Sequence, residues 1–481
     1  MANNITITDF GAVPDGKTLC TEAFAAAIQA CIGMGGGTVH VPAGTYLTGP
    51  IHLESNITLN VEAGAILLFS QDIKDYPVVF SRWEGVDREV YSPLIYGKEL
   101  RNVAVTGRGI LDGQGKPWWE RFRNHELAYP RPRFISFDNC QNVLIEGITL
   151  TNSPAWTINP IETENITVTK VTIKNPAQSP NTDGINPESC KNVHISNCHI
   201  DVGDDCITLK AGTEECSKRV PCENITITNC TMVHGHGGVV IGSEMSGGVR
   251  NVVISNCVFE GTDRGIRMKS RRGRGGLIED IRVNNIVMKD VITPLVMHLY
   301  YRCGPGGEDP HVVDRNPKPV DQTTPIFRRI HISNITAREI RAAAAFLYGL
   351  PEMPIEDISF DNISLRMADH AAPAAPAMMV GLDPMVKKGV CCTNVRDVSF
   401  NNVTVENADG PAFTIENSEN IDLIRCAAKA ADSSQPVIRL ENTKQVLVQG
   451  CKLRKGQTNF LALKGDANSQ IELVGNSKAI N

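Results

Sequence analysis

A short segment recurs through most of this chain and restricts its fold more than any other feature. The segment reads Asn-(Val/Ile)-x-(Ile/Val)-x-Asn, and its central copies begin at Asn142, Asn165, Asn192, Asn224 and Asn251. The steps between these copies range from 23 residues (142 to 165) to 32 residues (192 to 224). Self-similarity at such a period indicates a fold of stacked repeats. Looser copies begin near residues 56, 102, 280, 330, 357, 398, 421 and 446.

Each copy alternates apolar and polar residues over a few positions, which is the period of a β-strand with one buried face. A strand this short cannot bury its apolar face alone, whereas a stack of successive coils encloses a continuous interior. β-Branched residues dominate the copies and long 3.6-residue periodicity is missing, so a helical solenoid is excluded. We therefore predict an all-β fold, a right-handed parallel β-helix (solenoid).

One helix is expected near the start of the chain, from about residue 21 to residue 32. This segment is rich in alanine and is followed by three glycines at 35–37. A short N-terminal helix of this kind would cap the open end of the solenoid. We expect a single domain over 1–481, with a cap region over about 1–50, active-site coils over about 150–301 and C-terminal coils over about 326–481.

The cysteines follow the repeat. Cys198, Cys230 and Cys257 each lie six residues after the first Asn of a copy, so they are expected to stack as small apolar side chains in the interior. The total of fifteen is odd, which favours free thiols over a disulfide framework. The sequence contains no cluster with metal-ligand spacing, and we expect no metal site.

The composition describes a folded chain without a general excess of basic residues. Hydrophobic residues make up 42% and charged residues 21%, which excludes wholesale disorder. The formal net charge of -6 argues against a nucleic-acid partner. No apolar run is long enough to cross a membrane, so no membrane partner is expected. The N-terminus lacks a signal-peptide pattern, which predicts a cytoplasmic protein, or an extracellular or periplasmic one if a signal has been removed.

Polar side chains interrupt four consecutive coils. The segments are Asn181-Thr-Asp183, Gly203-Asp204-Asp205, Gly235-His236-Gly237 and Arg267-Met-Lys269. When the apolar strands that follow them are aligned, Asp183 lies beneath Asp205 and His236 lies above Asp204. Arg267 and Lys269 project from the next coil on the same face. Because neighbouring coils lie about 4.8 Å apart, the groups are expected to form one patch about 15 Å long.

A patch of this kind suits the hydrolysis of a glycoside. That reaction requires a proton donor for the leaving oxygen and a carboxylate that handles the nucleophile. Carboxylates at one-coil spacing repel one another when ionised, which raises the pKa of at least one of them. The repulsion is therefore expected to supply a protonated acid near neutral pH. A nearby Arg and Lys can bind the carboxylate of a uronic acid.

The four segments resemble the signatures of the polygalacturonase family, glycoside hydrolase family 28, which are Asn-Thr-Asp, Asp-Asp, Gly-His-Gly and Arg-x-Lys. All four occur in order, and repeats compatible with that fold cover most of the chain. The resemblance implies that Asp204 is the general acid and that Asp183 and Asp205 hold the hydrolytic water, with inversion at the anomeric carbon. It also implies that His236 tunes the acid. The substrate-binding residues it implies are Arg267, Lys269 and Asn181, with Tyr300 or Tyr301 at the subsite.

The implied reaction is hydrolysis of α-1,4-galacturonosidic bonds in galacturonan, the anionic polysaccharide of pectin, without a cofactor. Two insertions break the repeat, at 113–133 and 302–325, and insertions of this length are more often functional than accidental. Together with the missing secretion signal, they favour attack from a chain end, as in a bacterial exo-polygalacturonase.

Three other functions are alternatives. A hydrolase of rhamnogalacturonan or substituted galacturonan would use Arg267 and Lys269 on a different pattern of uronic acids. A pectate-lyase-type β-helix enzyme would cleave by elimination, normally with Ca²⁺, and would release an unsaturated product. A non-catalytic β-helix, such as an adhesin or a sugar-binding module, would cleave nothing.

Two further features allow more than one interpretation. The basic run from Lys269 to Arg274 follows the proposed carboxylate-binding pair, and we expect it to extend the groove for an anionic sugar. A solvated loop is the alternative for this run. Trp118 and Trp119 could either stack on sugar rings or anchor their own loop, and the sequence does not decide between these roles.

Overall fold

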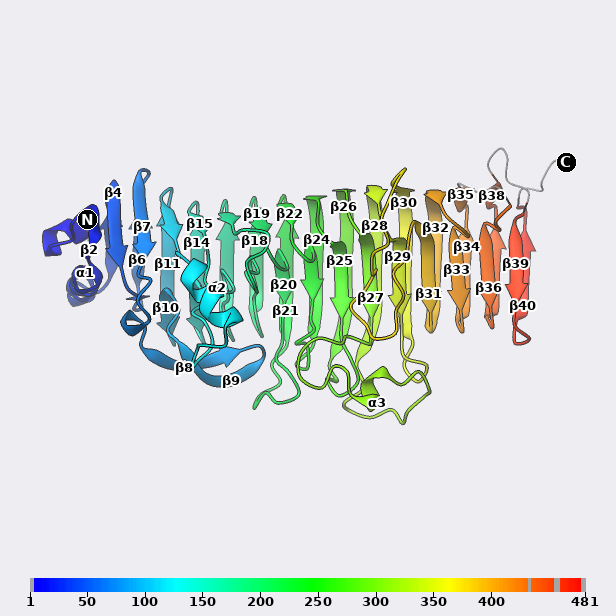
Figure 1. Ribbon diagram of the computed structural model, residues 1–481, viewed down its shortest axis with the longest axis horizontal. Coiled ribbons are helices and arrows are strands. Elements are labelled where there is room, and N and C mark those ends of the chain that lie inside the picture. Colours follow the sequence, from blue (N-terminus) through cyan, green and yellow to red (C-terminus); the bar gives the residue numbers. More distant parts are fainter. Residues whose placement is uncertain (1–3, 431–433, 454–458, 477–481) are drawn as a thin grey trace. The chain divides into compact units, whose positions relative to one another are not determined.

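The structure is a computed structural model that describes residues 4–430, 434–453 and 459–476. The chain divides into two compact units, Met1–His236 and Gly237–Asn481. Each unit is a right-handed parallel β-helix, and its successive strands lie side by side in Figure 1. This confirms the fold predicted from the repeat. The single-domain organisation over 1–481 stays a prediction.

The coils of the N-terminal unit have three strand-bearing faces. One face carries β1 (Asn4–Thr6), β3 (Gly37–Val41), β6 (Ile57–Val61), β11 (Arg101–Gly107), β14 (Gln141–Glu146), β16 (Glu164–Thr169), β18 (Lys191–Ser196) and β21 (Cys222–Thr228). The second carries β2 (Asp15–Leu19), β4 (Gly44–Thr48), β7 (Ala65–Phe69), β12 (Ile110–Asp112), β15 (Thr149–Thr151), β17 (Thr172–Lys174), β19 (His199–Val202) and β22 (Thr231–His234). The third carries β5 (Ile51–His52), β10 (Ile95–Lys98) and β13 (Ile135–Asp138), and isolated bridges continue it through Ile158 and Ile185 to β20 (Ile207–Leu209).

The C-terminal unit has two sheets, and the first five strands of one of them are 12–15 residues long. Its first sheet contains β24 (Val249–Glu260), β26 (Leu277–Lys289), β28 (Ile326–Ile340), β30 (Ile355–Met367), β32 (Val395–Ala408), β34 (Glu419–Ile424), β35 (Ala427–Ala430), β37 (Lys444–Gln449), β38 (Lys452–Leu453) and β40 (Ser469–Val474). Its second sheet contains β23 (Val239–Ile241), β25 (Arg264–Lys269), β27 (Thr293–His298), β29 (Ala343–Tyr348), β31 (Lys388–Thr393), β33 (Phe413–Glu416), β36 (Ile438–Glu441) and β39 (Leu461–Lys464). The short helix α3 (Pro310–Val313) lies in the insertion between β27 and β28.

The first Asn of each repeat has a structural role at the bend that begins a strand. Asn142, Asn165 and Asn192 have φ values of 60°, 60° and 58°, in the left-handed region that Asn tolerates better than most residues. The amide of Asn165 donates to Asn142 at 3.0 Å and accepts from Asn192 at 3.0 Å. This ladder of amides runs from Asn56 to Asn224 within the N-terminal unit. The repeat therefore encodes both the backbone bend and the hydrogen bonds that join neighbouring coils.

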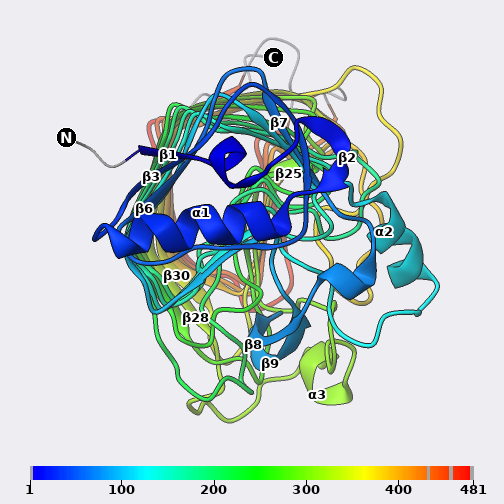
Figure 2. The ribbon, with the colours of Figure 1, turned by 90° about the vertical axis from the view of Figure 1, so that its left-hand side faces the viewer.

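The predicted helix and the predicted thiol positions are both confirmed. Helix α1 (Thr21–Gly33) packs against β1 and β3 and lies across the first coil (Figure 2). Its buried side chains include Phe24 and Ile28, which close the apolar end of the N-terminal unit. All fifteen cysteines are free. The thiols of Cys198 and Cys230 hydrogen-bond each other in the interior, and Cys257 is buried at the same repeat position.

One projection from the N-terminal unit has no counterpart in the repeat. An antiparallel hairpin of β8 (Val78–Trp83) and β9 (Val86–Tyr91) stands out from the coils in Figure 1. A second projection, α2 (Lys116–Arg123), lies in the insertion at 113–133. No helix among the described residues is long and apolar enough to span a membrane.

Candidate active site

Three carboxylates meet on the third face of the N-terminal unit. Ile185 pairs with Ile207 on the neighbouring coil, so the register sets Asp183 beside Asp205, as the sequence alignment predicts. One side-chain oxygen from each of Asp183, Asp204 and Asp205 lies within 4.8 Å of the others. Main-chain hydrogen bonds hold the two coils together here, because the Gly184 amide donates to the Asp205 carbonyl at 3.0 Å. The cluster is thus built on paired backbone rather than on a free loop.

The three carboxyl groups differ in burial. Asp183 is 3% exposed and Asp205 is 2% exposed, whereas the side chain of Asp204 is 21% exposed. Burial, the negative charge of Asp204 and that of Asp205 raise the pKa of Asp183 well above its ordinary value, against the opposing effect of Lys210. The pKa elevation predicted for at least one carboxyl group of the cluster is therefore found at Asp183.

His236 is the partner of Asp204. Its Nδ1 lies 3.1 Å from Oδ1 of Asp204, and the backbone amide of Asp205 donates to the same oxygen at 2.9 Å. Both contacts fall on Oδ1, and Oδ2 of Asp204 accepts no hydrogen bond from the described residues. The arrangement therefore leaves Oδ2 as the oxygen of Asp204 able to face a ligand.

Arg131 is a neighbour of the carboxylates that the sequence did not identify. It is 1% exposed, donates to Oδ1 of Asn181 at 2.6 Å and stacks on the ring of Phe122. Burial lowers the pKa of Arg131 to about 10, and the negative charges of Glu84 and Asp183 oppose this effect. Asn181, expected to bind substrate, thus has its amide oxygen engaged by Arg131. The available signal was the alternation of proline and arginine at 130–133, which places Arg131 between two prolines.

Lys210 is a second residue that the sequence reading missed. It is 4% exposed, and its Nζ lies 4.8 Å from the ring centroid of Trp156. Its positive charge lowers the pKa of Asp183, in opposition to burial. The available signal was a lysine placed directly after the apolar strand β20, where a charged residue on a buried strand end is unusual.

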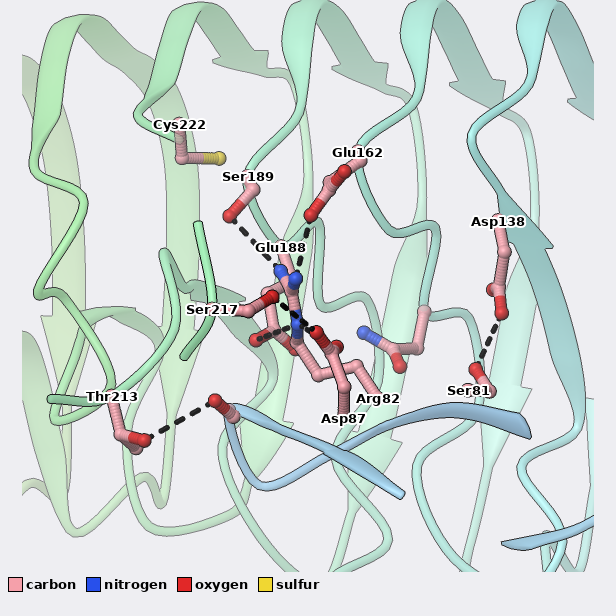
Figure 3. A network of polar contacts seen from close by, with 12 residues as sticks. Ser81, Arg82, Asp87, Asp138, Glu162, Glu188, Ser189, Thr213, Ser217 and Cys222 are labelled. Carbon is pink, nitrogen blue, oxygen red and sulfur yellow. Dashed lines mark hydrogen bonds and ion pairs between the residues drawn. The ribbon is translucent and has the colours of Figure 1, made fainter. Parts of the chain in front are cut away.

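The hairpin β8–β9 is attached to the same face. Trp83 stacks on Trp156, with ring centroids 5.1 Å apart and planes 16° from parallel. Arg82 is 2% exposed and binds Asp87 on the hairpin at 2.9 Å, Glu162 at 2.6 Å and the hydroxyl of Ser189 at 3.4 Å (Figure 3). At the hairpin tip, the amide of Thr213 donates to the carbonyl of Gly85 at 3.3 Å. These contacts fix the hairpin beside the coils that carry Asp183, Asp204 and Asp205.

A cationic group occupies the second sheet of the C-terminal unit. Val239 pairs with Ile266 and Val240 with Arg267, which confirms the predicted register of these two coils. Arg267 is 1% exposed and Lys269 is 5% exposed. The ring of Tyr301 lies 5.1 Å from Lys269 Nζ and 5.9 Å from the Arg267 guanidinium carbon. That Arg267 and Lys269 form one patch with the three carboxylates stays a prediction from the sequence.

Tyr300 does not join this group. It is 2% exposed, and its ring lies under the guanidinium of Arg315 at 4.0 Å, with Arg272 at 5.4 Å. Of the two tyrosines left open by the sequence, only Tyr301 contacts the cations expected to bind substrate.

The interpretation of the basic run as an extended groove is wrong for Arg271 and Arg272, because both are buried inside the insertion that follows. Arg272 donates to the carbonyl oxygens of His311 and Asp314 at 3.1 Å and 2.5 Å, and it pairs with Glu352 at 2.6 Å. Arg271 donates to the carbonyl oxygens of Cys303 and Pro305. Their charges hold the insertion at 302–325 in place rather than facing a sugar.

The two tryptophans of the first insertion also have an internal role. Trp118 is buried and packs against Tyr76 and Tyr91, with ring centroids 5.0 Å and 5.4 Å away. The indole nitrogen of Trp119 donates to the carbonyl of Ser153 at 2.9 Å. Of the two roles considered, loop anchoring is the one supported by these contacts.

Comparisons with known proteins agree with this geometry. Residues 31–374 match the family Glycosyl hydrolases family 28. A "Probable polygalacturonase" of Vitis vinifera is 36% identical over 382 residues, which cover 77% of this chain and 76% of the relative. An endo-polygalacturonase of Pectobacterium carotovorum subsp. carotovorum is 30% identical over 310 residues, covering 60% and 74%. The crystal structure of an exopolygalacturonase from Thermotoga maritima is 32% identical, with a TM-score of 0.70, and the match covers 84% of this chain and 91% of that one.

The family match spans well over half of the chain and includes every residue of the carboxylate cluster and of the cationic group. The solved structure of the Thermotoga maritima exopolygalacturonase shares the fold described above. This chain therefore belongs to glycosyl hydrolase family 28.

Proposed function

We propose that this protein hydrolyses α-1,4-galacturonosidic bonds in galacturonan. The observation that carries the proposal is the cluster of Asp183, Asp204 and Asp205, in which one oxygen from each side chain lies within 4.8 Å of the others. Glycoside hydrolysis requires a proton donor and a carboxylate that handles the nucleophile, and this cluster contains candidates for both. Arg267 and Lys269 supply the positive charge that a uronic acid requires.

The proposed general acid is Asp204. It is the most exposed of the three carboxyl groups, and its Oδ2 is able to face the glycosidic oxygen. The proposed water-holding pair is Asp183 and Asp205. Asp183 has the raised pKa, so it must lose its proton before it can activate water. Lys210 opposes the elevation and thereby favours the ionised form of Asp183.

The stereochemistry follows from how the water is held. If Asp183 and Asp205 direct water to the face opposite Asp204, the product has inverted configuration. A separation near 5 Å is more common in retaining enzymes, in which a carboxylate attacks the sugar directly. Proton NMR of the first anomer released from trigalacturonate distinguishes the two. An inverted anomer is expected, and a retained anomer would contradict the role of the water-holding pair.

The first experiment compares wild type, Asp204→Asn and Asp201→Asn on trigalacturonate and polygalacturonate. Asp201 is the matched control, because it lies on the same coil and also pairs with a histidine, His234, at 2.9 Å. Chromatography and ultraviolet absorbance follow the products together. We expect wild type and Asp201→Asn to release saturated galacturonate, and Asp204→Asn to release none. An absorbing unsaturated product would instead establish an elimination, as in a lyase.

A second substrate tests the roles within the cluster. An aryl galacturonide with a good leaving group needs little protonation of the leaving oxygen. Asp204→Asn should therefore retain much more activity on the aryl glycoside than on trigalacturonate. Asp183→Asn should lose activity on both. The reverse pattern would assign the acid to Asp183. Because no cofactor is proposed, treatment with EDTA should leave all wild-type rates unchanged.

We further propose attack from a chain end. Lys269 pairs in register with His298, which pairs with Tyr348, so these three positions lie on one face of successive coils. The guanidinium of Arg315 lies 5.2 Å from the Tyr348 ring and donates to the carbonyl of Val380 at 2.7 Å. The insertion at 302–325 thus covers this face two coils beyond Lys269.

Products of an early polymer digest test the mode of attack. Exo action predicts monogalacturonate alone from the outset, whereas a mixed ladder of intermediate oligomers would contradict it. Rhamnogalacturonan is the alternative substrate, and the same assay on that polymer decides between the two. The cytoplasmic location expected from the sequence gains no support from the relatives, and cell fractionation with an antibody is the direct test.

A further inference from the structure

His298 is a buried polar side chain without a partner. It ends strand β27 at 0% exposure, and neither ring nitrogen has a hydrogen-bond partner among the described residues. Native proteins pair nearly all of their buried polar groups, so an orphaned pair of nitrogens in one ring calls for an explanation. The described protein contacts give none, because the neighbouring ring of Tyr301, 6.2 Å away, offers only van der Waals packing at that distance.

The location of His298 suggests what its partner is. His298 pairs in register with Lys269, so the two side chains leave the same face of the sheet on adjacent coils. The Tyr301 ring lies beside Lys269, Arg267 and His298 together. A substrate carboxylate bound by Arg267 and Lys269 beside this ring would therefore lie next to His298 on the adjacent coil.

The charge state of His298 fits a hydrogen-bonding role. Burial and the positive charges of Arg267, Lys269, Arg264 and Arg315 lower its pKa well below the ordinary value. The imidazole is therefore neutral, with one N–H donor and one acceptor nitrogen. A third cation would only add to the charge around the uronate, whereas a neutral imidazole can also recognise a hydroxyl group.

We propose that His298 binds substrate in the uronate subsite, donating to or accepting from a ring hydroxyl of the sugar whose carboxylate contacts Arg267 and Lys269. This inference rests on the proposed function, since it assigns a further residue to the same subsite. The bound sugar completes the hydrogen bonds that the protein leaves unmade. Arg267 and Lys269 then recognise the charge of the uronate, and His298 recognises one of its hydroxyl groups.

The test replaces His298 with Phe, which keeps a planar ring and removes both nitrogens, and with Gln, which restores one donor and one acceptor. Galacturonate binding is measured from the shift in melting temperature that it produces, which requires no turnover. His331→Phe is the matched control, because His331 lies in the other sheet and is satisfied by Ser359 at 2.8 Å.

His298→Phe should melt at the same or a higher temperature than wild type, since a buried unpaired polar ring is removed. It should weaken galacturonate binding and raise the KM for trigalacturonate by at least about tenfold, with a smaller change in kcat. His298→Gln should recover part of the affinity, and His331→Phe should bind normally. Normal binding by a stable His298→Phe would overturn the proposal and leave His298 a packing residue. Failure of the wild type to cleave galacturonan would instead contradict the proposed function.

Discussion

His236 Nδ1 lies 3.1 Å from Oδ1 of Asp204, and two residues earlier His234 Nδ1 lies 2.9 Å from Oδ1 of Asp201. The chain therefore presents the same histidine–carboxylate pair twice, once in the carboxylate cluster and once outside it. The second pair is a built-in control for the first.

His236→Ala should lower kcat by roughly tenfold to a hundredfold, because Asp204 loses a charge-stabilising hydrogen bond where the proton is transferred. His234→Ala should leave kcat within about twofold of wild type, since exposed pairs contribute little. Initial rates on trigalacturonate measure both. Equal losses in the two variants would show that His236 acts only through the fold.

Asp183→Asn should be inactive but more stable at neutral pH. Because the folded-state pKa of Asp183 lies above its ordinary value of 3.8, the folded protein binds this proton more readily than the unfolded chain does. The stabilisation is complete below that value and is lost as pH rises through the folded-state pKa. The variant lacks this loss, so its melting temperature should exceed that of wild type by an amount that grows with pH above 4. A constant difference across pH would contradict the elevated pKa.

Arg82→Met should destabilise the N-terminal unit by about 3–5 kcal/mol, the usual cost of leaving buried carboxylates without their cation. Glu188, at 0% exposure and 3.9 Å from Arg82, and Glu162 are the carboxylates that lose the positive charge of Arg82. Urea unfolding measures the loss, and limited proteolysis should cut within residues 78–91 in the variant first. Lys170→Met, which removes an exposed pair with Glu146, is the control and should change stability by less than about 1 kcal/mol.

Asn165→Ala and Asn165→Gly separate the two roles of the repeat asparagine. Both variants lose the amide bonds to Asn142 and Asn192. Alanine also meets the penalty of positive φ, which glycine avoids. Asn165→Ala should therefore lower the unfolding free energy by about 1–3 kcal/mol, and Asn165→Gly by less. Equal losses would show that the amide ladder alone decides the preference for Asn.

The local residue pattern is sufficient to define the coil. Alternating residues define which side chains enter the interior, and this local periodicity is enough to predict the β-helix, the capping helix and the register that sets Asp183 beside Asp205. It also identified the acidic and basic segments, because each holds a fixed position relative to an apolar strand. These features depend on residues that are close in sequence and recur along the chain, so they can be predicted without knowledge of distant contacts.

Contacts between distant side chains depend on the folded chain as a whole. The attachment of the β8–β9 hairpin depends on Arg82 meeting Glu162 and Ser189, which are 80 and 107 residues away in sequence. Burial likewise depends on how the folded chain packs. It raises the pKa of Asp183, leaves the ring nitrogens of His298 without protein partners, and encloses Arg272 so that it binds the insertion at 302–325. No periodic pattern encodes these contacts, because they depend on individual side chains that meet across coils or come from insertions.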